Sequence, residues 1–152
     1  MNKVTFSPQL HPTISEIGTV SADTHYPINL FQSPVAAGFP SPAESWVERS
    51  LDLNDLCIRN PTATYFVRVK GESMIDAGID DGSYLVIDRA LECQHNCIVV
   101  ARVGSELTVK RLETKPVMRL VPANPAFQPI ETEGMDVEII GVATFAIKRL
   151  TP

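Results

Sequence analysis

The sequence predicts a mainly β protein: a compact domain of twisted antiparallel strands with one short N-terminal helix and an extended N-terminal tail. Two observations predict this class. Beyond residue 61, short runs rich in β-branched residues alternate with turn residues. Before residue 41 the chain has five prolines and no sustained helical or strand period. We therefore expect a flexible tail, residues 1–40, and a folded domain, residues 41–152.

Composition narrows the function classes. The 152 residues suffice for one domain, and 44% of them are hydrophobic. A net charge of -5 argues against direct, specific DNA binding, which needs a basic face, so any link to DNA would run through a partner protein. No apolar run approaches the roughly 20 residues that span a bilayer. Three cysteines, an odd number, fit reduced thiols in the cytoplasm.

A helix start is readable where the domain begins. Ser41 can cap the helix, Pro42 suits its first position, and Glu44 completes a capping box. Apolar residues then recur at helical spacing, which predicts a helix over residues 42–51. We interpret Trp46 on this helix as a core anchor.

The remaining elements should be strands. Gly104-Ser105, with glycine first, predicts a two-residue type II′ hairpin between two of them. The expected strands are Thr64 to Lys70, Tyr84 to Asp88, Cys97 to Val103, Glu106 to Leu112, Met118 to Val121 and Val137 to Lys148.

Alternation along the strand that follows this hairpin places Lys110 on one face with Thr108 and Leu112. If that face is covered, desolvation lowers the lysine pKa, and a neutral amine could accept the hydroxyl proton of Ser73. Strand lysines are more often exposed, so spacing alone favours an ordinary surface charge.

An ordered set of motifs runs from Phe39 to Leu150. It comprises Phe39-Pro40-Ser41-Pro42-Ala43, Leu53-Asn54, Ala63-Thr64-Tyr65-Phe66-Val67, Gly71-Glu72-Ser73-Met74-Ile75-Asp76, Gly78-Ile79-x-Asp81-Gly82, Leu85-Val86-Ile87-Asp88, Thr108-Val109-Lys110 and Pro122-x-Asn124. In these motifs, their order and their spacing, the chain resembles the self-cleaving SOS-response family of LexA and UmuD proteins and phage repressors.

The resemblance implies an autoproteolytic serine peptidase. Ser73 would be the nucleophile and Lys110 the general base, because a buried neutral lysine can activate a serine without a histidine. The scissile bond would join Ala37 to Gly38. Backbone N–H groups of Glu72 and Ser73 would hold the oxyanion, with Gly71 allowing the turn that carries them. Neither a metal nor another cofactor is implied.

The resemblance also implies a cellular role. Cleavage would be stimulated by a RecA filament on single-stranded DNA. The shortened protein would act as a homodimer that joins a UmuC-type Y-family polymerase in translesion synthesis, with the replicative sliding clamp as a further partner. The first 20 or so residues have no role in this scheme.

The main alternative is a LexA-like self-cleaving transcriptional repressor. A repressor needs a helix-turn-helix domain before the cleavage site, and residues 1–36 are too few and too rich in proline for one. Another alternative is a peptidase acting on other proteins, such as a relative of signal peptidase. Against it, the sequence lacks the membrane anchor of that enzyme, and it carries a plausible substrate bond of its own.

Two local features suggest other chemistry. Cys93-x-His95-x-Cys97 could bind a metal, although paired zinc ligands usually have two residues between them. His95 could replace Lys110 as the base, but Ile75 occupies the last glycine position of a Gly-x-Ser-x-Gly elbow.

The chain departs from the family pattern at Asn96-Cys97, where the resemblance implies Gly-Asp. Asparagine tolerates the left-handed backbone that such a turn needs.

Overall fold

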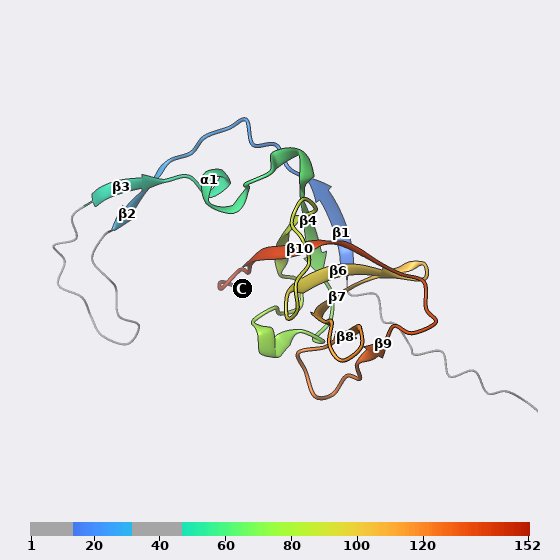
Figure 1. The fold of residues 1–152 in the computed structure, drawn as a ribbon. Helices are drawn as coiled ribbons and strands as arrows, with labels where there is room; N and C mark the ends of the chain where they lie inside the picture. The colour runs from blue at the N-terminus through green and yellow to red at the C-terminus, as the bar shows by residue number, and fades with distance from the viewer. Residues whose placement is uncertain (1–13, 32–46) are drawn as a thin grey trace, which may run out of the picture.

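The computed structural model describes residues 14–31 and 47–152 of the chain (Figure 1). The predicted fold class is confirmed, because strands dominate the described residues. The elements are β1 (Ile14–Thr19), β2 (Ile28–Phe31), β3 (Val47–Leu51), α1 (Leu53–Cys57), η1 (Pro61–Ala63), β4 (Thr64–Val69), η2 (Ile75–Ala77), β5 (Tyr84–Asp88), β6 (Ile98–Val103), β7 (Glu106–Glu113), β8 (Arg119–Val121), β9 (Ile130–Glu131) and β10 (Val137–Ile147), where η marks a 3-10 helix.

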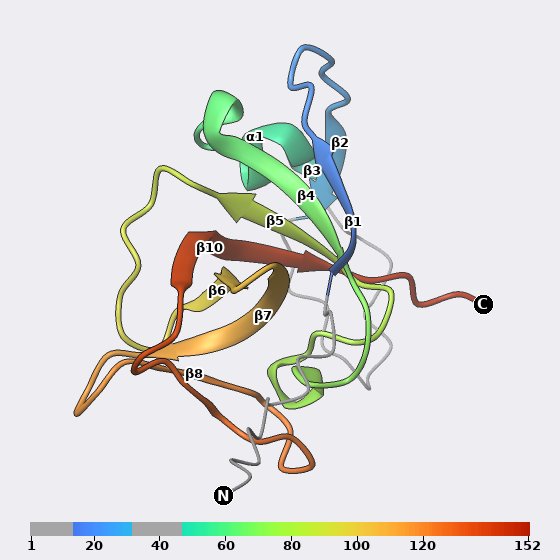
Figure 2. The same ribbon diagram turned by 90° about the vertical axis from the view of Figure 1, so that its right-hand side faces the viewer.

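Eight of these strands form one antiparallel sheet in the order β1-β4-β5-β10-β6-β7-β8-β9. The last strand in sequence, β10, lies in the middle and pairs with β6 through its first half and with β5 through its second half. Both pairings contain a register shift, which is typical of a bulge that bends a strand. Figure 2 shows the resulting curvature, with β4 and β5 on one side of β10 and β6 and β7 on the other.

Apolar side chains cover both faces of the β6–β7 hairpin. Val100 and Val109 belong to one buried cluster, which also receives side chains from β4 and β5. Val99 and Leu112 belong to a second cluster with residues of β8, β9 and β10. Because both faces are covered, β7 can hold a polar side chain away from water.

The six strands predicted from residue 64 onward are confirmed as β4, β5, β6, β7, β8 and β10, each within one residue of its expected bounds. The short strand β9 was not predicted. The predicted hairpin is present, with Val103 paired with Glu106. Gly104 has φ +60°, whereas Asn96 is the one non-glycine residue with positive φ in the described ranges. Ser105 therefore has negative φ, which fits a type II′ turn and excludes type I′. Asn96 itself has φ +71°, as expected for the left-handed turn.

The predicted helix over residues 42–51 is wrong for the part that the structure describes. Val47–Leu51 forms β3, which pairs antiparallel with β2. The helix begins instead at Leu53, where the carboxylate of Asp52 accepts a hydrogen bond from Asn54 N at 2.8 Å. Pairing with a distant strand overrides local helical periodicity here. Residues 42–46, including Trp46, lie outside the described residues.

The first 40 residues contain more regular structure than their composition predicts. β1 forms an edge strand on β4, and β2 pairs with β3. Side chains of β1 are largely exposed, so this strand has no apolar alternation by which to recognise it. The division of the chain at residue 40 remains a prediction. No helix in the described ranges is both long enough and apolar enough to cross a bilayer.

A glycine in β10 provides a test of the central packing. A Cβ atom on Gly141 would lie 2.7 Å from Cγ2 of Ile87 and 3.2 Å from the carbonyl oxygen of Asp88. We expect Gly141→Ala to lower the free energy of unfolding by roughly 1–3 kcal/mol, because backbone and a fully buried side chain must move. Thermal and urea unfolding measure the change. Gly18→Ala is the matched control, since nothing lies within 4 Å of its Cβ position; equal losses in both variants would contradict this packing.

Candidate active site

Ser73 lies in a tight turn between β4 and η2. Gly71 opens the turn with φ +89°, a conformation that favours glycine. Its backbone N–H donates to the carboxylate of Asp81 at 2.6 Å. Met74, 1% exposed, inserts its side chain into the core directly after the serine. These contacts fix both ends of the turn and leave Ser73 itself buried.

A distant segment braces the same turn. Asn124 Nδ2 donates to the carbonyl oxygen of Glu72 at 2.9 Å, and Ile75 N donates to the same oxygen at 3.2 Å. Ala123 N donates to the carbonyl oxygen of Ser73 at 2.8 Å. A trans peptide points its N–H away from its C=O, so the two bonds to the Glu72 oxygen fix the direction of the Ser73 N–H. That N–H is one of the two predicted oxyanion donors.

Lys110 approaches Ser73 from the middle of β7. Its side chain is among the buried polar groups of the protein. The amine Nζ lies 3.0 Å from Ser73 Oγ, 2.8 Å from Thr108 Oγ1 and 2.9 Å from the carbonyl oxygen of Val109. The structure thus brings together two residues that are 37 positions apart, and it places them on the covered face required for the lysine to act as a base.

Burial lowers the pKa of the Lys110 amine from 10.5 to about 8. All three hydrogen-bond partners of Nζ are neutral, and no carboxylate in the described ranges forms an ion pair with it. A counter-ion would have raised the pKa again. A substantial fraction of the amine is therefore neutral near pH 8.

The three partners also determine what happens when the ammonium loses a proton. An ammonium has three N–H donors, and a neutral amine has two donors and one lone pair. The carbonyl of Val109 can only accept. If Thr108 keeps the second N–H, the lone pair faces the hydroxyl of Ser73, which can then donate its proton to the amine. Thr108 and the Val109 carbonyl act as positioning groups for Lys110.

The residues of the predicted scissile bond, Ala37 and Gly38, lie outside the described residues. The alternative base, His95, accepts a hydrogen bond from Thr114 N at its Nδ1, at 3.0 Å, whereas the hydroxyl of Ser73 is hydrogen-bonded to Lys110. The three cysteines are free thiols, and burial raises the pKa of both Cys57 and Cys93.

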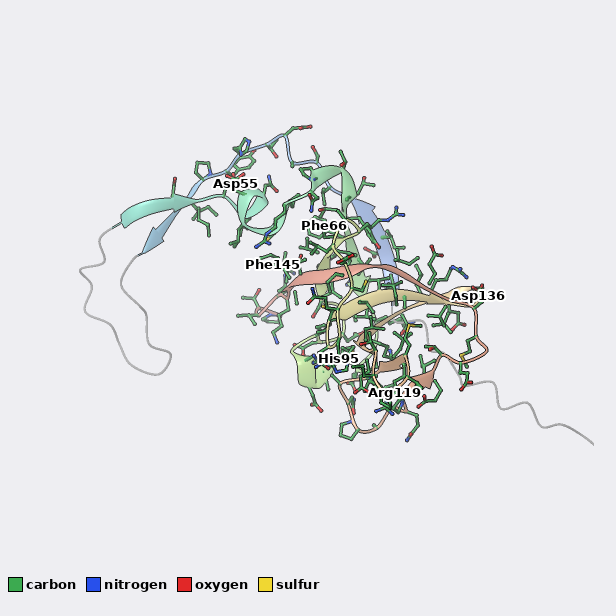
Figure 3. The ribbon with its side chains drawn as sticks, viewed as in Figure 1. Asp55, Phe66, His95, Arg119, Asp136 and Phe145 are labelled. Atoms are coloured by element: carbon green, nitrogen blue, oxygen red, sulfur yellow. The ribbon has the colours of Figure 1, made fainter. Side chains whose placement is uncertain are left out.

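One cluster of titratable side chains was not expected. His25, Asp52 and Asp55 bring ligand atoms within 4.8 Å of one another, the one such metal-compatible group in residues 14–31 and 47–152. Cys93, His95 and Cys97 form no such group there. The Asp52 carboxylate already accepts from the backbone N–H groups at positions 26 and 54. Figure 3 shows Asp55 on α1, away from the main sheet, so this cluster fastens the N-terminal segment to α1 and is separate from the Ser73 site.

Sequence reasoning assigned no role to Thr108, Ala123 or Asn124. Two of them were part of the matched motifs Thr108-Val109-Lys110 and Pro122-x-Asn124. Their place in those motifs was the signal by which the sequence could have identified them. The folded chain shows that Thr108 orients Lys110 and that Asn124 braces the turn of Ser73.

On this β scaffold a buried serine hydroxyl contacts a buried lysine of low pKa, a pairing in which the lysine could activate the serine as a nucleophile. Residues 29–144 match the Peptidase S24-like family. The chain is 45% identical over 131 residues to protein ImpA of Salmonella typhimurium, covering 85% of this chain and 89% of that protein. It is 44% identical over 122 residues to protein MucA of Escherichia coli, covering 79% and 84%.

A third relative is the LexA repressor of Hahella chejuensis, 42% identical over 113 residues, with 71% of this chain and 56% of that protein covered. The chain belongs to the Peptidase S24-like family and is a serine peptidase. The family resemblance predicted from the motifs is confirmed.

Removing the lysine amine tests its desolvation. The folded pKa of Lys110 is about 8 against 10.5 for an unperturbed lysine, so between these pH values the unfolded state binds more protons and stability rises with pH. Lys110→Met lacks this dependence. We expect its free energy of unfolding, relative to the unmodified protein, to fall by about 2–3 kcal/mol between pH 7 and pH 10. Urea unfolding at several pH values measures it.

Lys70→Met is the control, because it removes an exposed lysine amine instead of a buried one. A stability difference for Lys110→Met that varies with pH no more than that for Lys70→Met would contradict a desolvated amine at position 110. The change in unfolding free energy with pH is compared, not its absolute value, because the hydrogen bonds that methionine cannot form lower the absolute stability of Lys110→Met.

Proposed function

We propose that this protein cleaves its own chain between Ala37 and Gly38, with Ser73 as nucleophile and Lys110 as general base. The observation that carries the proposal is the 3.0 Å contact between Lys110 Nζ and Ser73 Oγ, made by an amine whose pKa is lowered to about 8. A serine hydroxyl becomes a useful nucleophile when a neutral base accepts its proton as it attacks.

The reaction would run in two steps. In the first, Ser73 Oγ attacks the carbonyl carbon of Ala37 while its proton passes to Lys110 Nζ. The oxyanion of the tetrahedral intermediate is stabilised by the backbone N–H groups of Ser73 and Glu72. As the C–N bond breaks, the Lys110 ammonium gives that proton to the leaving nitrogen of Gly38, and an ester between Ala37 and Ser73 remains.

The second step hydrolyses this ester. Lys110, neutral again, accepts a proton from water, which attacks the same carbonyl carbon. Ser73 leaves with the proton that Lys110 returns, and the new carboxyl group of Ala37 is released. Each step uses the lysine first as a base and then as an acid, which requires a pKa near the working pH.

Two features of the chain support an internal substrate. The proposed bond lies in the segment that connects β2 to β3, and the antiparallel pairing of these strands brings both ends of that segment together. Alanines at positions 36 and 37 are small enough for a backbone to approach a buried serine. Because enzyme and substrate are then one molecule, the reaction needs no separate substrate recognition.

In the cell we propose a role in SOS mutagenesis. A RecA filament on single-stranded DNA would favour the docked, deprotonated state, and residues 38–152 would then act in the cytoplasm as a homodimer. This dimer would join a UmuC-type Y-family polymerase, with the sliding clamp as a further partner. The aligned region that spans 89% of protein ImpA supports this assignment.

A LexA-like repressor is the second candidate, supported by 42% identity to the LexA repressor of Hahella chejuensis. The aligned region covers 56% of that protein, so a large part of the repressor has no counterpart in the alignment. Gel-shift titration of the purified protein with SOS promoter fragments distinguishes the two. Tight, sequence-specific binding would support the repressor, and the absence of specific binding would support the accessory protein.

Alkaline self-cleavage tests the proposed chemistry. Purified protein should yield a fragment that begins at Gly38, at a rate that increases roughly tenfold per pH unit below pH 8 and levels off above it. Ser73→Ala and Lys110→Ala should each abolish the fragment. Intact mass spectrometry over time measures both the rate and the position of the cut.

Lys70→Ala is the matched control and should cleave like the unmodified protein, since this lysine is exposed. A fragment that still forms in Ser73→Ala would point to a contaminating protease. The absence of any Gly38 fragment at alkaline pH, even with added RecA filaments, would defeat the proposal.

A further inference from the structure

β1 occupies the edge of the main sheet by pairing antiparallel with β4 (Figure 2). Ile14 is opposite Val69, Glu16 is opposite Arg68, and Thr19 is opposite Tyr65. Without β1, the outer backbone N–H and C=O groups of β4 would have no partner, and such an edge readily accepts another extended chain. Residues that the family resemblance left without a role thus cover a potential docking edge.

Few side-chain contacts hold β1 in this position. Ile14 packs against the cluster that contains Val69, but Ile17 is 58% exposed. Glu16 Oε1 forms an ion pair with Arg68 Nη1 at 3.2 Å, and both side chains are largely accessible to water. A strand that buries so little apolar surface depends on its backbone hydrogen bonds and on its covalent attachment to the rest of the chain.

The proposed cleavage removes that attachment. A cut between positions 37 and 38 places β1 and β2 on one fragment and their partner strands on the other. Pairing that was intramolecular, with a high effective concentration, becomes an equilibrium between two molecules that dilution and competitors can shift.

We propose that the outer edge of β4 is a docking site for an extended, acidic segment of a partner protein, and that β1 covers this edge until the chain is cut. This inference rests on the proposed self-cleavage for its trigger. The partner segment would add as a strand antiparallel to β4, a common mode of peptide recognition. Cleavage would then activate binding by uncovering a surface that already exists in the fold.

β1 indicates what the partner segment should contain. An apolar residue is needed beside Val69, where Ile14 packs, and an acidic residue is needed opposite Arg68, where Glu16 pairs. The guanidinium of Arg68 also lies 5.7 Å from the centre of the Tyr84 ring, which helps to hold it in place. The combination selects for an acidic strand over a basic one.

The same charge argues against a second copy of this chain as the occupant. The exposed edge would be Thr64–Val69, whose side chains are Thr, Tyr, Phe, Val, Arg and Val. It contains no carboxylate, so pairing β4 with β4 of another copy would leave Arg68 without an acidic partner. Charge complementarity therefore favours a different protein.

The test separates docking from self-cleavage. In a Ser73→Ala background, a recognition sequence for a specific protease replaces residues 35–40, so that the cut does not depend on the proposed dyad. After cutting and gel filtration, the fragment that contains β1 should be lost. Hydrogen–deuterium exchange should then increase in β4, residues 64–69, and stay unchanged in β10, which reports that the fold is intact.

Binding is measured with a fluorescent synthetic peptide of residues 14–20 as the probe. We expect about tenfold or more tighter binding to the cut protein than to the intact one. A Glu16→Lys peptide should bind about threefold or more weakly, and Arg68→Glu in the cut protein should restore its binding. Restoration distinguishes a specific charge contact from general damage to the edge.

Three results would overturn the inference. They are retention of the β1 fragment through gel filtration, equal peptide binding to cut and intact protein, and protection of β4 that grows with protein concentration in the absence of peptide. The last would show that a second copy fills the edge. None of these results bears on whether Ser73 and Lys110 cut the chain, because the added protease makes the cut.

Discussion

The burial of one lysine amine among neutral partners governs this site. Lys110 Nζ contacts a serine hydroxyl, a threonine hydroxyl and a backbone carbonyl, and burial lowers its pKa to about 8. The fold has to supply that environment from both sides. β7 lies between β6 and β8 with apolar clusters on each face, so the strand that carries the lysine is shielded along its middle. Burying an amine whose hydrogen-bond partners are all neutral reduces stability, which is a common compromise at functional sites.

The serine depends on contacts that are distant in sequence. Gly71 supplies a backbone conformation that few other residues adopt, Met74 anchors the turn in the core, and Asn124 fixes the peptide group before Ser73. The proposed nucleophile thus lies in a turn after β4, and the proposed base lies on β7. A proposed cut at Ala37–Gly38 would change the same sheet at its edge, where β1 pairs with β4. Chemistry and partner binding are linked in this proposal through a single covalent bond.

Much of the fold could be predicted from local pattern. β-branched runs and turn chemistry predicted six of the strands after residue 63, the Gly104-Ser105 hairpin and the left-handed Asn96, although they did not predict the two-residue strand β9. The sequence predicted a helix over residues 42–51, but residues 47–51 form β3. This strand depends on its pairing with β2, and no local sequence signal reveals that pairing. β1 was missed for a related reason: its side chains are exposed, and its stability comes from backbone pairing. At the site, the motifs indicated Ser73 and Lys110, but alternation alone could not show which face of β7 is covered.

The proposed chemistry requires a Lys110 amine that is largely neutral in the folded protein. This amine can be titrated by NMR through the ¹³Cε chemical shifts of labelled lysines, with Lys110→Met used to assign the signal. We expect Lys110 to titrate near pH 8, well below the unperturbed lysine value of 10.5. A Lys110 signal that titrates near 10.5 would contradict the proposed chemistry, because an amine that stays protonated could not accept the proton of Ser73.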